Sequence, residues 1–394
     1  MLDFLSLRAD TPGVQHVVHF NNAGASLMPK PVIDAITNHI ELEASIGGYE
    51  AAQAREEVIT NFYTSTAELL NTNAENIAAM ASATDAYAQA LSSIPFERGD
   101  VILTTINDYV SNQIAFISLQ KRFGIEIVRA ADEPENGVSV DDMAQKIKAL
   151  RPKLVAVTHV PTNSGLVQPV EAIGQLCREN DVLYLVDACQ SVGQLPVNVT
   201  QIQCDFLTAT GRKFLRGPRG TGFLYVSDKA LAANLAPLFI DLHGATWESA
   251  DTYQLIETAR RFENWEFPYA LILGAAEANR YALNIGLDTI ARRNADLCAS
   301  LRRQLVELPG VRLLDEGKQL SSIITFVSDR KSAYELKAAL QAEHINTSIS
   351  GHGAAILDFD RKGMKTAALR ISPHYFNTED EINTLVETLK NALA

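Results

Sequence analysis

Cysteine is scarce in this chain, which has four among 394 residues: Cys177, Cys189, Cys204 and Cys298. None of them shows a CxxC or Cys/His spacing, so neither a zinc site nor a disulfide framework is indicated. We therefore expect reduced thiols in or near the core of a cytoplasmic protein that has no metal site.

Long apolar runs and an excess of basic residues are also missing. No stretch approaches the roughly 18 apolar residues of a membrane-spanning helix, and the segment MLDFLSLRAD lacks the basic-then-apolar order of a signal peptide. The net charge of −13 argues against a nucleic-acid partner. No GxGxxG follows an early strand, which argues against a dinucleotide-binding dehydrogenase. We expect a small-molecule partner, and neither nucleic acid nor a membrane.

Short β-branched runs alternate with amphipathic, helix-length segments through the first two thirds of the chain. The runs lie at residues 101–106, 125–130, 154–160, 183–188, 206–210 and 222–226. One intervening helix is expected after Ser139, with Met143 and Ile147 on one face, and another near residues 170–179. This alternation predicts an α/β fold with a mostly parallel sheet and helices on both faces. The last two runs are too close for a crossover helix, so we expect them to form an antiparallel edge pair.

The pattern changes near residue 270. A long helical stretch to residue 308 is expected to break near Gly286 and to end before Pro309 and Gly310. Strands are then expected at residues 311–315, 322–328, 345–350 and 368–372, with helices at 332–342 and from Thr378 onward. We predict an N-terminal segment (1–20) that packs on the small domain, a large domain (21–270) and a smaller C-terminal α+β domain (271–394).

Lys213 carries the main functional prediction. The apolar run LYLVDACQ ends in an acid, Asp187, with Gln190 about one turn further on, and Lys213 follows the next predicted strand. Most lysines are solvated. A carboxylate that closes a buried strand, followed by a lysine after the next one, is instead what a pyridoxal phosphate (PLP) site requires. The lysine forms a Schiff base with the cofactor, and the acid pairs with the pyridinium nitrogen.

Further candidates collect at the carboxyl ends of the predicted strands, where parallel sheets bind ligands. Ala83 and Thr84 precede a helix whose N–H groups suit a phosphate, although Thr84 is also compatible with an ordinary cap. Thr210 offers a second hydroxyl and Arg212 a positive charge. Two more arginines of the same segment are interpreted as solvated turn residues, Arg216 and Arg219.

Four other residues are each compatible with a functional and a structural role. Tyr109 follows a strand and is placed either to stack on the cofactor ring or to fill the core. Thr162 and Asn163 are able to reach the cofactor's phenolic oxygen, or simply form a turn. Arg370 lies in an apolar strand and needs an anion, which is either a substrate carboxylate or a structural acid.

With these residues the chain resembles the class V aminotransferase family of fold-type I PLP enzymes, which includes cysteine desulfurases, C–S lyases and isopenicillin N epimerase-like proteins. The likeness covers nearly the whole chain and is strongest in VDACQSVGQLPV, GRKFLRGPRGTGFLYV and LRISPHYFNTEDEI. It implies that Gln190 contacts the phenolic oxygen and that Asn22 approaches the substrate. It also implies a homodimer, in which RRFENWEF, from Arg260 to Phe267, reaches the partner's active site.

The sequence departs from the family in three places. The loop ISGHGAAILDFDRKGM holds no cysteine where desulfurases carry their nucleophile, so ordinary desulfurase activity is not expected. Arg212 replaces a histidine, and Trp265 with Glu266 replaces a small hydroxyl-bearing pair. The segments TGRKFLRGPRGTGF and RRFENWEF resemble most closely the C–S lyase-like branch. His352, in the loop from Gly351 to Thr366, is a further candidate substrate contact.

The expected chemistry is removal of the Cα proton of an amino acid by Lys213. Our first hypothesis is a C–S β-lyase acting on an S-substituted cysteine or its sulfoxide. An aminotransferase is the alternative, followed by an epimerase, because the three outcomes share the same first proton transfer.

Overall fold

A computed structural model describes residues 3–133 and 137–394; residues 1–2 and 134–136 lie outside the description. Its centre is a seven-stranded sheet in the order β2 (Ile77–Met80), β10 (Gly222–Val226), β9 (Phe206–Thr210), β8 (Leu183–Asp187), β7 (Leu154–Thr158), β3 (Val101–Thr104) and β4 (Glu126–Arg129). The strands from β9 to β4 are parallel, and β10 is antiparallel to both of its neighbours. The predicted α/β class is confirmed.

The six predicted strands of this sheet are present, and four of them are shorter than predicted. The antiparallel pairing of β9 with β10 is confirmed, but its position at the edge is wrong, because β2 pairs with β10 and forms the edge. The sequence of β2, Ile-Ala-Ala-Met, leads directly into the alanine-rich start of a helix. It therefore lacks the β-branched signature by which the other strands were recognised.

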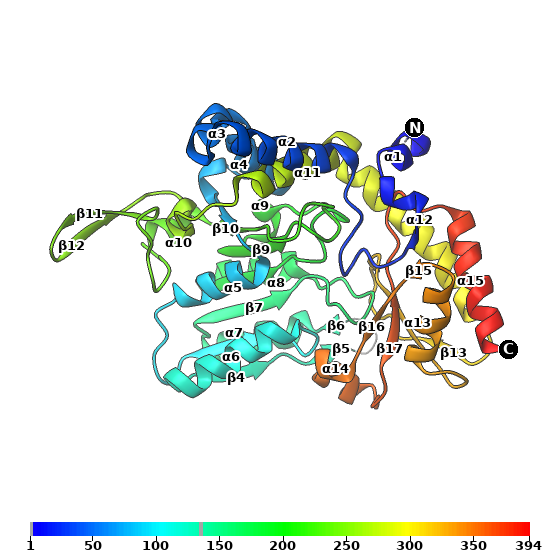
Figure 1. Ribbon diagram of the computed structural model, residues 1–394. Helices are drawn as coiled ribbons and strands as arrows, with labels where there is room; N and C mark the ends of the chain where they lie inside the picture. Colours follow the sequence, from blue (N-terminus) through cyan, green and yellow to red (C-terminus); the bar gives the residue numbers. More distant parts are fainter. Residues whose placement is uncertain (1–2, 134–136) are drawn as a thin grey trace.

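Helices cover both faces of the sheet, as predicted (Figure 1). On one face α5 (Ala83–Ser92) and α6 (Val110–Phe123) bury side chains such as Tyr87 and Phe116. On the other, α7 (Val140–Leu150), α8 (Val170–Glu179), α4 (Glu56–Leu70) and α11 (Tyr269–Ile285) contribute Met143, Ile147 and Ile173. The Ser139 hydroxyl caps α7 by accepting the Asp142 N–H, as its sequence predicted.

The C-terminal part forms a second, antiparallel sheet. Its strand order is β13 (Val311–Leu313), β14 (Ile324–Ser328), β17 (Ala368–Ile371) and β16 (Ser348–Ser350), and it packs with α12 (Leu287–Val306), α13 (Ala333–Ala342) and α15 (Glu379–Leu393). Gly286, at φ 89°, separates α11 from α12 at the predicted break. The N-terminal β1 (Val18–His19) pairs in parallel with β15 (Ile345–Asn346). The domain boundaries themselves stay a prediction.

The remaining elements are short or peripheral. They are α1 (Phe4–Ala9), α2 (Lys30–Ile46), α3 (Gly48–Ala54), α9 (Val199–Ile202), α10 (Asp228–Ala232), α14 (Ile356–Arg361), β5 (Asp132–Glu133), β6 (Gly137–Val138), β11 (Ala245–Ser249), β12 (Thr252–Leu255) and the 3₁₀ turns η1 (Pro12–Gln15), η2 (Ala74–Asn76), η3 (Ala259–Phe262) and η4 (His352–Ala354). The β11–β12 hairpin projects away from the rest of the molecule (Figure 1). Within the described ranges, no helix has both the length and the apolar character needed to span a bilayer.

Candidate active site

A cavity of about 310 Å³ lies where several strands of the large sheet end. It brings together the ends of β8 and β9, the turn after β9, and the N-termini of α5 and α6. Its lining comprises Ala81, Ser82, Ala83, Thr84, Tyr109, Asn112, Asp187, Cys189, Thr210, Arg212, Lys213, Arg219 and Gly220. Seven of the residues predicted from the sequence therefore share one cavity, at the edge where parallel sheets bind ligands.

Lys213 is buried in this cavity, with 7% of its surface exposed. The turn that carries it is closed by a hydrogen bond from the Arg216 N–H to the Lys213 carbonyl (2.9 Å). Burial lowers the pKa of its amine, and the nearby Arg212 and Arg370 lower it further, while Cys189 and Asp187 oppose the shift. The amine is thus biased toward its neutral, nucleophilic form.

Asp187 ends β8 with its carboxylate buried beneath the cavity. Oδ1 accepts the Cys189 N–H (2.9 Å), and Oδ2 accepts Nδ2 of Asn112 (3.1 Å). An ionised carboxylate has about four lone-pair sites, so these two bonds leave it able to bind another buried N–H. Its position therefore suits the protonated nitrogen of a pyridine ring.

The start of α5 provides a site for an anion. Ser82 caps the helix by accepting the Asp85 N–H (3.1 Å), and the N–H groups of Ala83 and Thr84 belong to the first turn, which has no intrahelical acceptors. A Cβ on Gly222 would lie 2.9 Å from the Ser82 carbonyl carbon, so this glycine lets β10 approach the helix start closely.

The other cationic and hydroxyl groups near α5 differ in availability. Arg212 lines the cavity and donates to the Gly24 carbonyl. The Thr210 hydroxyl donates to the Thr221 carbonyl (3.1 Å), so its hydrogen is already used. Arg219 is exposed, as predicted. Arg216 is only 1% exposed, so its interpretation as a solvated residue is wrong.

Tyr109 forms the N-cap of α6 and is half buried at the cavity wall. The Lys213 Nζ lies 5.9 Å from the centroid of the Tyr109 ring. The ring is therefore on the lysine side of the cavity, in a position compatible with stacking on a bound aromatic ring.

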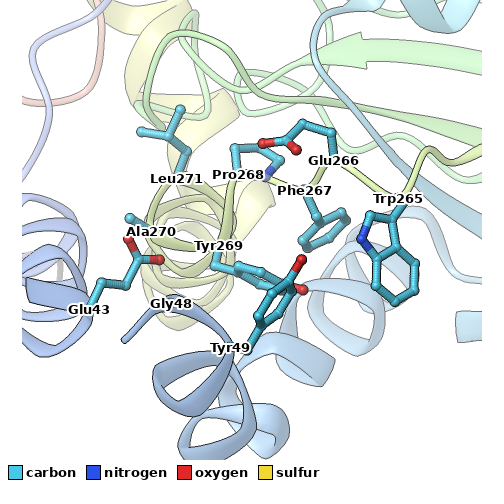
Figure 2. Close-up of a pocket in the computed structure, with 10 residues that line it drawn as sticks. All are labelled: Glu43, Gly48, Tyr49, Trp265, Glu266, Phe267, Pro268, Tyr269, Ala270 and Leu271. Carbon is cyan, nitrogen blue, oxygen red and sulfur yellow. The ribbon is translucent and has the colours of Figure 1, made fainter. Parts of the chain in front are cut away.

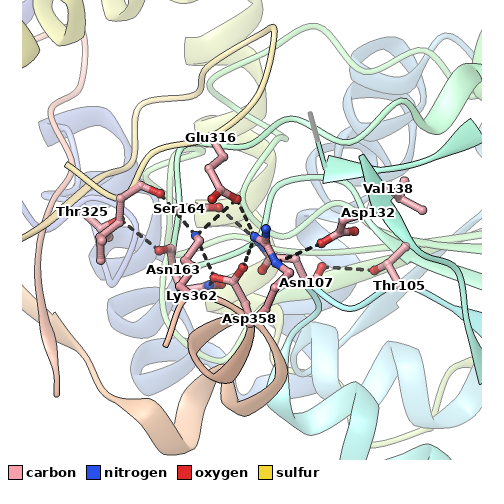
Figure 3. Close-up of polar contacts among 12 residues, drawn as sticks. Thr105, Asn107, Asp132, Val138, Asn163, Ser164, Glu316, Thr325, Asp358 and Lys362 are labelled. Carbon is pink, nitrogen blue, oxygen red and sulfur yellow. Dashed lines mark hydrogen bonds and ion pairs between the residues drawn. The ribbon is translucent and has the colours of Figure 1, made fainter. Parts of the chain in front are cut away.

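Six predicted residues do not line this cavity, and three of them have side chains that bind elsewhere. Asn22 is fully buried, donates to the Ser372 carbonyl (2.7 Å) and accepts the Ser26 hydroxyl (2.6 Å). His352 binds Asp360 (2.7 Å) and lines a separate surface hollow. Asn163 donates Nδ2 to Asp358 (2.6 Å), as Figure 3 shows.

Gln190 and Thr162 also do not line the cavity. Gln190 Nε2 donates to the Ala23 carbonyl (3.0 Å), while its Oε1 is buried and has no partner among the described residues. Thr162 uses its backbone carbonyl to accept an N–H of Arg370 (3.2 Å). The structure shows no side-chain contact between either residue and Lys213 within hydrogen-bonding distance.

Arg370 belongs to β17 and forms no ion pair with any acid of the described residues. Its guanidinium donates to the Thr162 carbonyl (3.2 Å) and the Ser348 hydroxyl (3.3 Å), while Nε is buried without a partner among the described residues. None of the ion pairs found in residues 3–133 and 137–394 involves it. Burial lowers the pKa of Arg370, and the nearby Arg212 lowers it further. A partly buried cation with an unpartnered Nε is suited to a bound carboxylate.

The loop from Gly351 to Thr366 takes part in a cluster of ion pairs (Figure 3). Asp358 of α14 binds Lys362 (3.0 Å) and Arg361 (2.7 Å) in addition to Asn163. Arg361 also forms an ion pair with Asp132 of β5 (3.4 Å). The cluster therefore connects the loop to the part of the chain that follows β4 of the large sheet. Burial raises the pKa of Asp132 to about 6.

Trp265, Glu266 and Phe267 lie outside the cavity of their own chain. They line a surface hollow of about 400 Å³ with Tyr49 and Tyr269, shown in Figure 2. Trp265 is 53% exposed and Tyr49 70% exposed. This hollow is an open aromatic surface rather than a closed pocket.

Asn112 and Cys189 are cavity residues that the sequence analysis missed. Asn112 lies three residues after Tyr109, about one helical turn on, so the predicted position of Tyr109 contained a usable signal. Cys189 stands between Asp187 and Gln190, but a single cysteine gives no pattern. Burial raises the pKa of the Cys189 thiol, with the Asp187 carboxylate as the second cause.

Comparisons with known proteins agree on one family and one fold. The profile of the family described as aminotransferase class-V matches residues 18–385. A probable cysteine desulfurase of Pyrococcus abyssi is 29% identical over 396 residues, which cover 98% of this chain and 96% of that protein.

Solved structures give the same fold. The apo cysteine desulfurase of Thermococcus onnurineus NA1 is 26% identical, with a TM-score of 0.91 over 100% of this chain and 98% of that one. A complex of the cystine C–S lyase C-DES with cysteine persulfide has a TM-score of 0.86 at 23% identity, covering 97% and 99% of the two chains. The predicted fold type is confirmed by these likenesses.

Proposed function

Because the chain belongs to the aminotransferase class-V family, whose enzymes use PLP, we propose that it is a C–S β-lyase for an S-substituted cysteine or its sulfoxide. Relatives of 26% and 29% identity are named cysteine desulfurases, which supports a cysteine-type substrate. The observation that carries the proposal is the missing thiol: the loop between Gly351 and Thr366 contains no cysteine. Without a thiolate to accept sulfur, the sulfur substituent has to leave with the Cβ–S electron pair.

The other cysteines do not replace that nucleophile. Cys177, Cys204 and Cys298 are buried in the hydrophobic core. Cys189 lines the cavity, but burial raises the pKa of its thiol, and an uncharged thiol is a poor nucleophile. The geometry therefore supports elimination over transfer of sulfur to the enzyme.

The cavity fits PLP by the chemistry of its donors. Lys213 is suited to hold the aldehyde carbon, Asp187 the ring nitrogen, and the N–H groups of Ala83 and Thr84 with Arg212 the phosphate. Tyr109 is placed to cover one ring face. When bound, PLP draws electrons away from the Cα of the substrate and makes its proton acidic.

Two residues of the chain then act on the substrate. Arg370 binds its α-carboxylate through the guanidinium donors that the protein leaves unused. Lys213 takes the Cα proton on Nζ, for which its lowered pKa suits it, since more of the amine is neutral near pH 7. Loss of the sulfur substituent, as a thiolate from a thioether or as a sulfenate from a sulfoxide, leaves a product that hydrolyses to pyruvate and ammonia.

The test is incubation of the PLP-loaded protein with S-alkyl cysteines and their sulfoxides, without any keto acid. Pyruvate and thiol released in equal amounts are expected from S-alkyl cysteines, and pyruvate and sulfenic acid in equal amounts from their sulfoxides. Lys213→Ala is expected to release none of these products and to lose the absorbance of lysine-bound cofactor. Conversion to a pyridoxamine form that only a keto acid reverses would instead establish an aminotransferase. Exchange of the Cα configuration without pyruvate would establish an epimerase.

We also infer a homodimer, in which residues 260–267 approach the partner's cofactor site. Trp265 and Tyr49 expose aromatic rings on one surface (Figure 2), and Leu238, Phe239 and Trp247 are exposed as well. Monomeric proteins seldom leave so much aromatic surface uncovered. Sedimentation equilibrium should give twice the chain mass, and Trp265→Asp should lower the association constant; a monomer for the unchanged protein would refute the inference.

A further inference from the structure

A second buried carboxylate, Asp108, lies directly behind the cavity. It precedes Tyr109 in the chain and is 6% exposed. No cation forms an ion pair with it in the part of the chain that the structure describes. Such a carboxylate is costly to bury unless hydrogen bonds replace its lost water.

Every contact that Asp108 makes is with a donor. Oδ1 accepts the Tyr109 N–H (2.7 Å), Nδ2 of Asn112 (3.1 Å) and the Thr158 hydroxyl. Oδ2 accepts Nε2 of Gln113 (2.7 Å) and the Thr104 hydroxyl (3.5 Å). Donors surround both oxygens. This arrangement favours the ionised form, because the O–H of a protonated carboxyl would point at another hydrogen-bond donor instead of an acceptor.

The Gln113 amide is itself fixed by a cation. Its Oε1 accepts an N–H of Arg129 (2.7 Å), so its Nε2 is the atom that faces Asp108. This arrangement polarises the amide toward the carboxylate without placing a charge beside it. Burial raises the pKa of Asp108, and the hydrogen bonds from Thr158, Gln113 and Asn112 oppose that shift.

Two of the donors to Asp108 belong to residues that line the cavity. Asn112 places one nitrogen 3.1 Å from Asp108 Oδ1 and 3.1 Å from Asp187 Oδ2, so its amide bridges the two carboxylates. The Tyr109 N–H is bound at the residue where α6 begins. Asp108 therefore orients both Tyr109 and the Asn112 amide, and that amide in turn binds Asp187, the acid proposed to contact the ring nitrogen.

We propose that Asp108 is a positioning residue for the cofactor, which it serves by holding Tyr109 and by directing the Asn112 amide onto Asp187. The proposal rests on the PLP site proposed above at Lys213. Asp108 does not line the cavity, so its effect passes through Tyr109 and Asn112.

The experiment compares Asp108→Asn with a matched control, Asp205→Asn. Asp205 is also a buried carboxylate, which accepts the Tyr184 N–H (3.0 Å) and the Ser227 hydroxyl (3.1 Å) away from the cavity. In Asp108→Asn the new amide presents a donor to the surrounding donors, so Tyr109 and Asn112 should shift. We expect PLP to bind about tenfold more weakly or worse, tenfold being about 1.4 kcal/mol. The circular dichroism of the cofactor band should also change. Asp205→Asn should change neither.

Urea unfolding of both cofactor-free variants separates positioning from a general loss of stability. Unchanged PLP affinity and unchanged circular dichroism in Asp108→Asn would overturn the proposal, and so would an equal effect of Asp205→Asn. If Asp108→Asn does not fold, Thr158→Val removes one donor to Asp108 and should move the same band in the same direction.

A double-mutant cycle with Asn112→Ala gives an independent test. If Asp108 acts through the Asn112 amide, the combined loss of PLP affinity should be clearly smaller than the sum of the single losses. Fully additive losses would contradict that route. Failure of the unchanged protein to bind PLP would refute the proposed function, whereas normal binding in Asp108→Asn would refute only this inference.

Discussion

Two arginines, the buried Arg216 and the partly buried Arg370, lie near Lys213, and neither has a carboxylate partner among the described residues. Every side-chain nitrogen of Arg216 donates to the protein: Nε to the Leu27 carbonyl (2.8 Å), and the two terminal nitrogens to the Tyr375 hydroxyl (2.7 Å) and the Thr11 hydroxyl (2.6 Å). Its guanidinium carbon also lies 4.4 Å from the centroid of the Phe376 ring. Arg370 makes two longer bonds and leaves Nε without a partner.

The difference separates a structural cation from a binding cation. Arg216 joins the N-terminal segment, the C-terminal segment and the turn of Lys213, whose carbonyl accepts its N–H. Its charge is satisfied by neutral oxygens and aromatic faces, so it requires no ligand. Arg370 bears the cost of burial without full compensation, which is the state expected of a group that meets its anion only when substrate binds.

The largest expected effect is on stability. Arg216→Met should lower the free energy of unfolding by about 5 kcal/mol, because three buried oxygens lose their donor at about 1–3 kcal/mol each. Urea unfolding of the cofactor-free protein measures the loss. Arg219→Met, three residues along and exposed, is the control and should change stability by less than about 0.5 kcal/mol. If Arg216→Met is as stable as the unchanged protein, then the hydrogen bonds of Arg216 do not stabilise the fold.

The second effect is on binding. Arg370→Gln should weaken amino-acid affinity by about 2–5 kcal/mol, because the substrate carboxylate loses its charged partner in a buried site. The measurement is a spectral titration of the PLP-loaded protein with the amino acid. Unfolding free energy should stay the same or rise, since an uncompensated buried charge is removed.

A matched control for Arg370 is Arg312→Gln, an exposed arginine on β13 of the same sheet. It should alter neither affinity nor stability. A normal affinity in Arg370→Gln, combined with a large loss of stability, would place Arg370 in the structural class with Arg216 and remove the proposed carboxylate site.

The two arginines also show what sequence could predict. Arg370 was predicted to bind an anion because an arginine inside an apolar strand is unusual in itself. Arg216 was misinterpreted because LRGPRG has the composition of a solvated turn, whereas its partners Thr11, Leu27, Tyr375 and Phe376 come from distant parts of the chain. Local composition cannot show which distant segments will cover a turn.

The same limit explains the rest of the site. Lys213, Asp187 and the start of α5 were predicted because their residue types stand at strand ends and a helix start, which the hydrophobic pattern fixes. Asn163 and His352 were placed in the right segments, but the direction of a side chain in a loop depends on partners such as Asp358 and Asp360. Those partners follow nearly two hundred residues after Asn163 and only eight after His352, and neither distance carries a recognisable spacing.

The smallest expected effect is on the pH dependence of stability, and it concerns His159, a neutral group that can be compared with the two arginines. His159, beside the end of β8, is buried with Nδ1 lacking a partner in the described residues, and burial lowers its pKa to about 4. The folded pKa lies below the unfolded value of about 6.5, so His159 favours folding above pH 6.5 and this contribution is lost as the pH falls toward 4. Between pH 7 and pH 5 the unchanged protein should lose about 2 kcal/mol more unfolding free energy than His159→Gln.

Urea unfolding at the two pH values measures this difference, with His16→Gln as a control in which the histidine is exposed. If His159→Gln keeps the full pH dependence, then His159 is compensated in the folded protein and resembles Arg216. If His159→Gln loses this pH dependence, then the structure has correctly identified His159 as a buried group whose hydrogen bonds are incomplete. The rule that distinguishes Arg370 from Arg216 would then hold for a group that binds no ligand, because its basis is the balance of donors and acceptors around a buried polar atom.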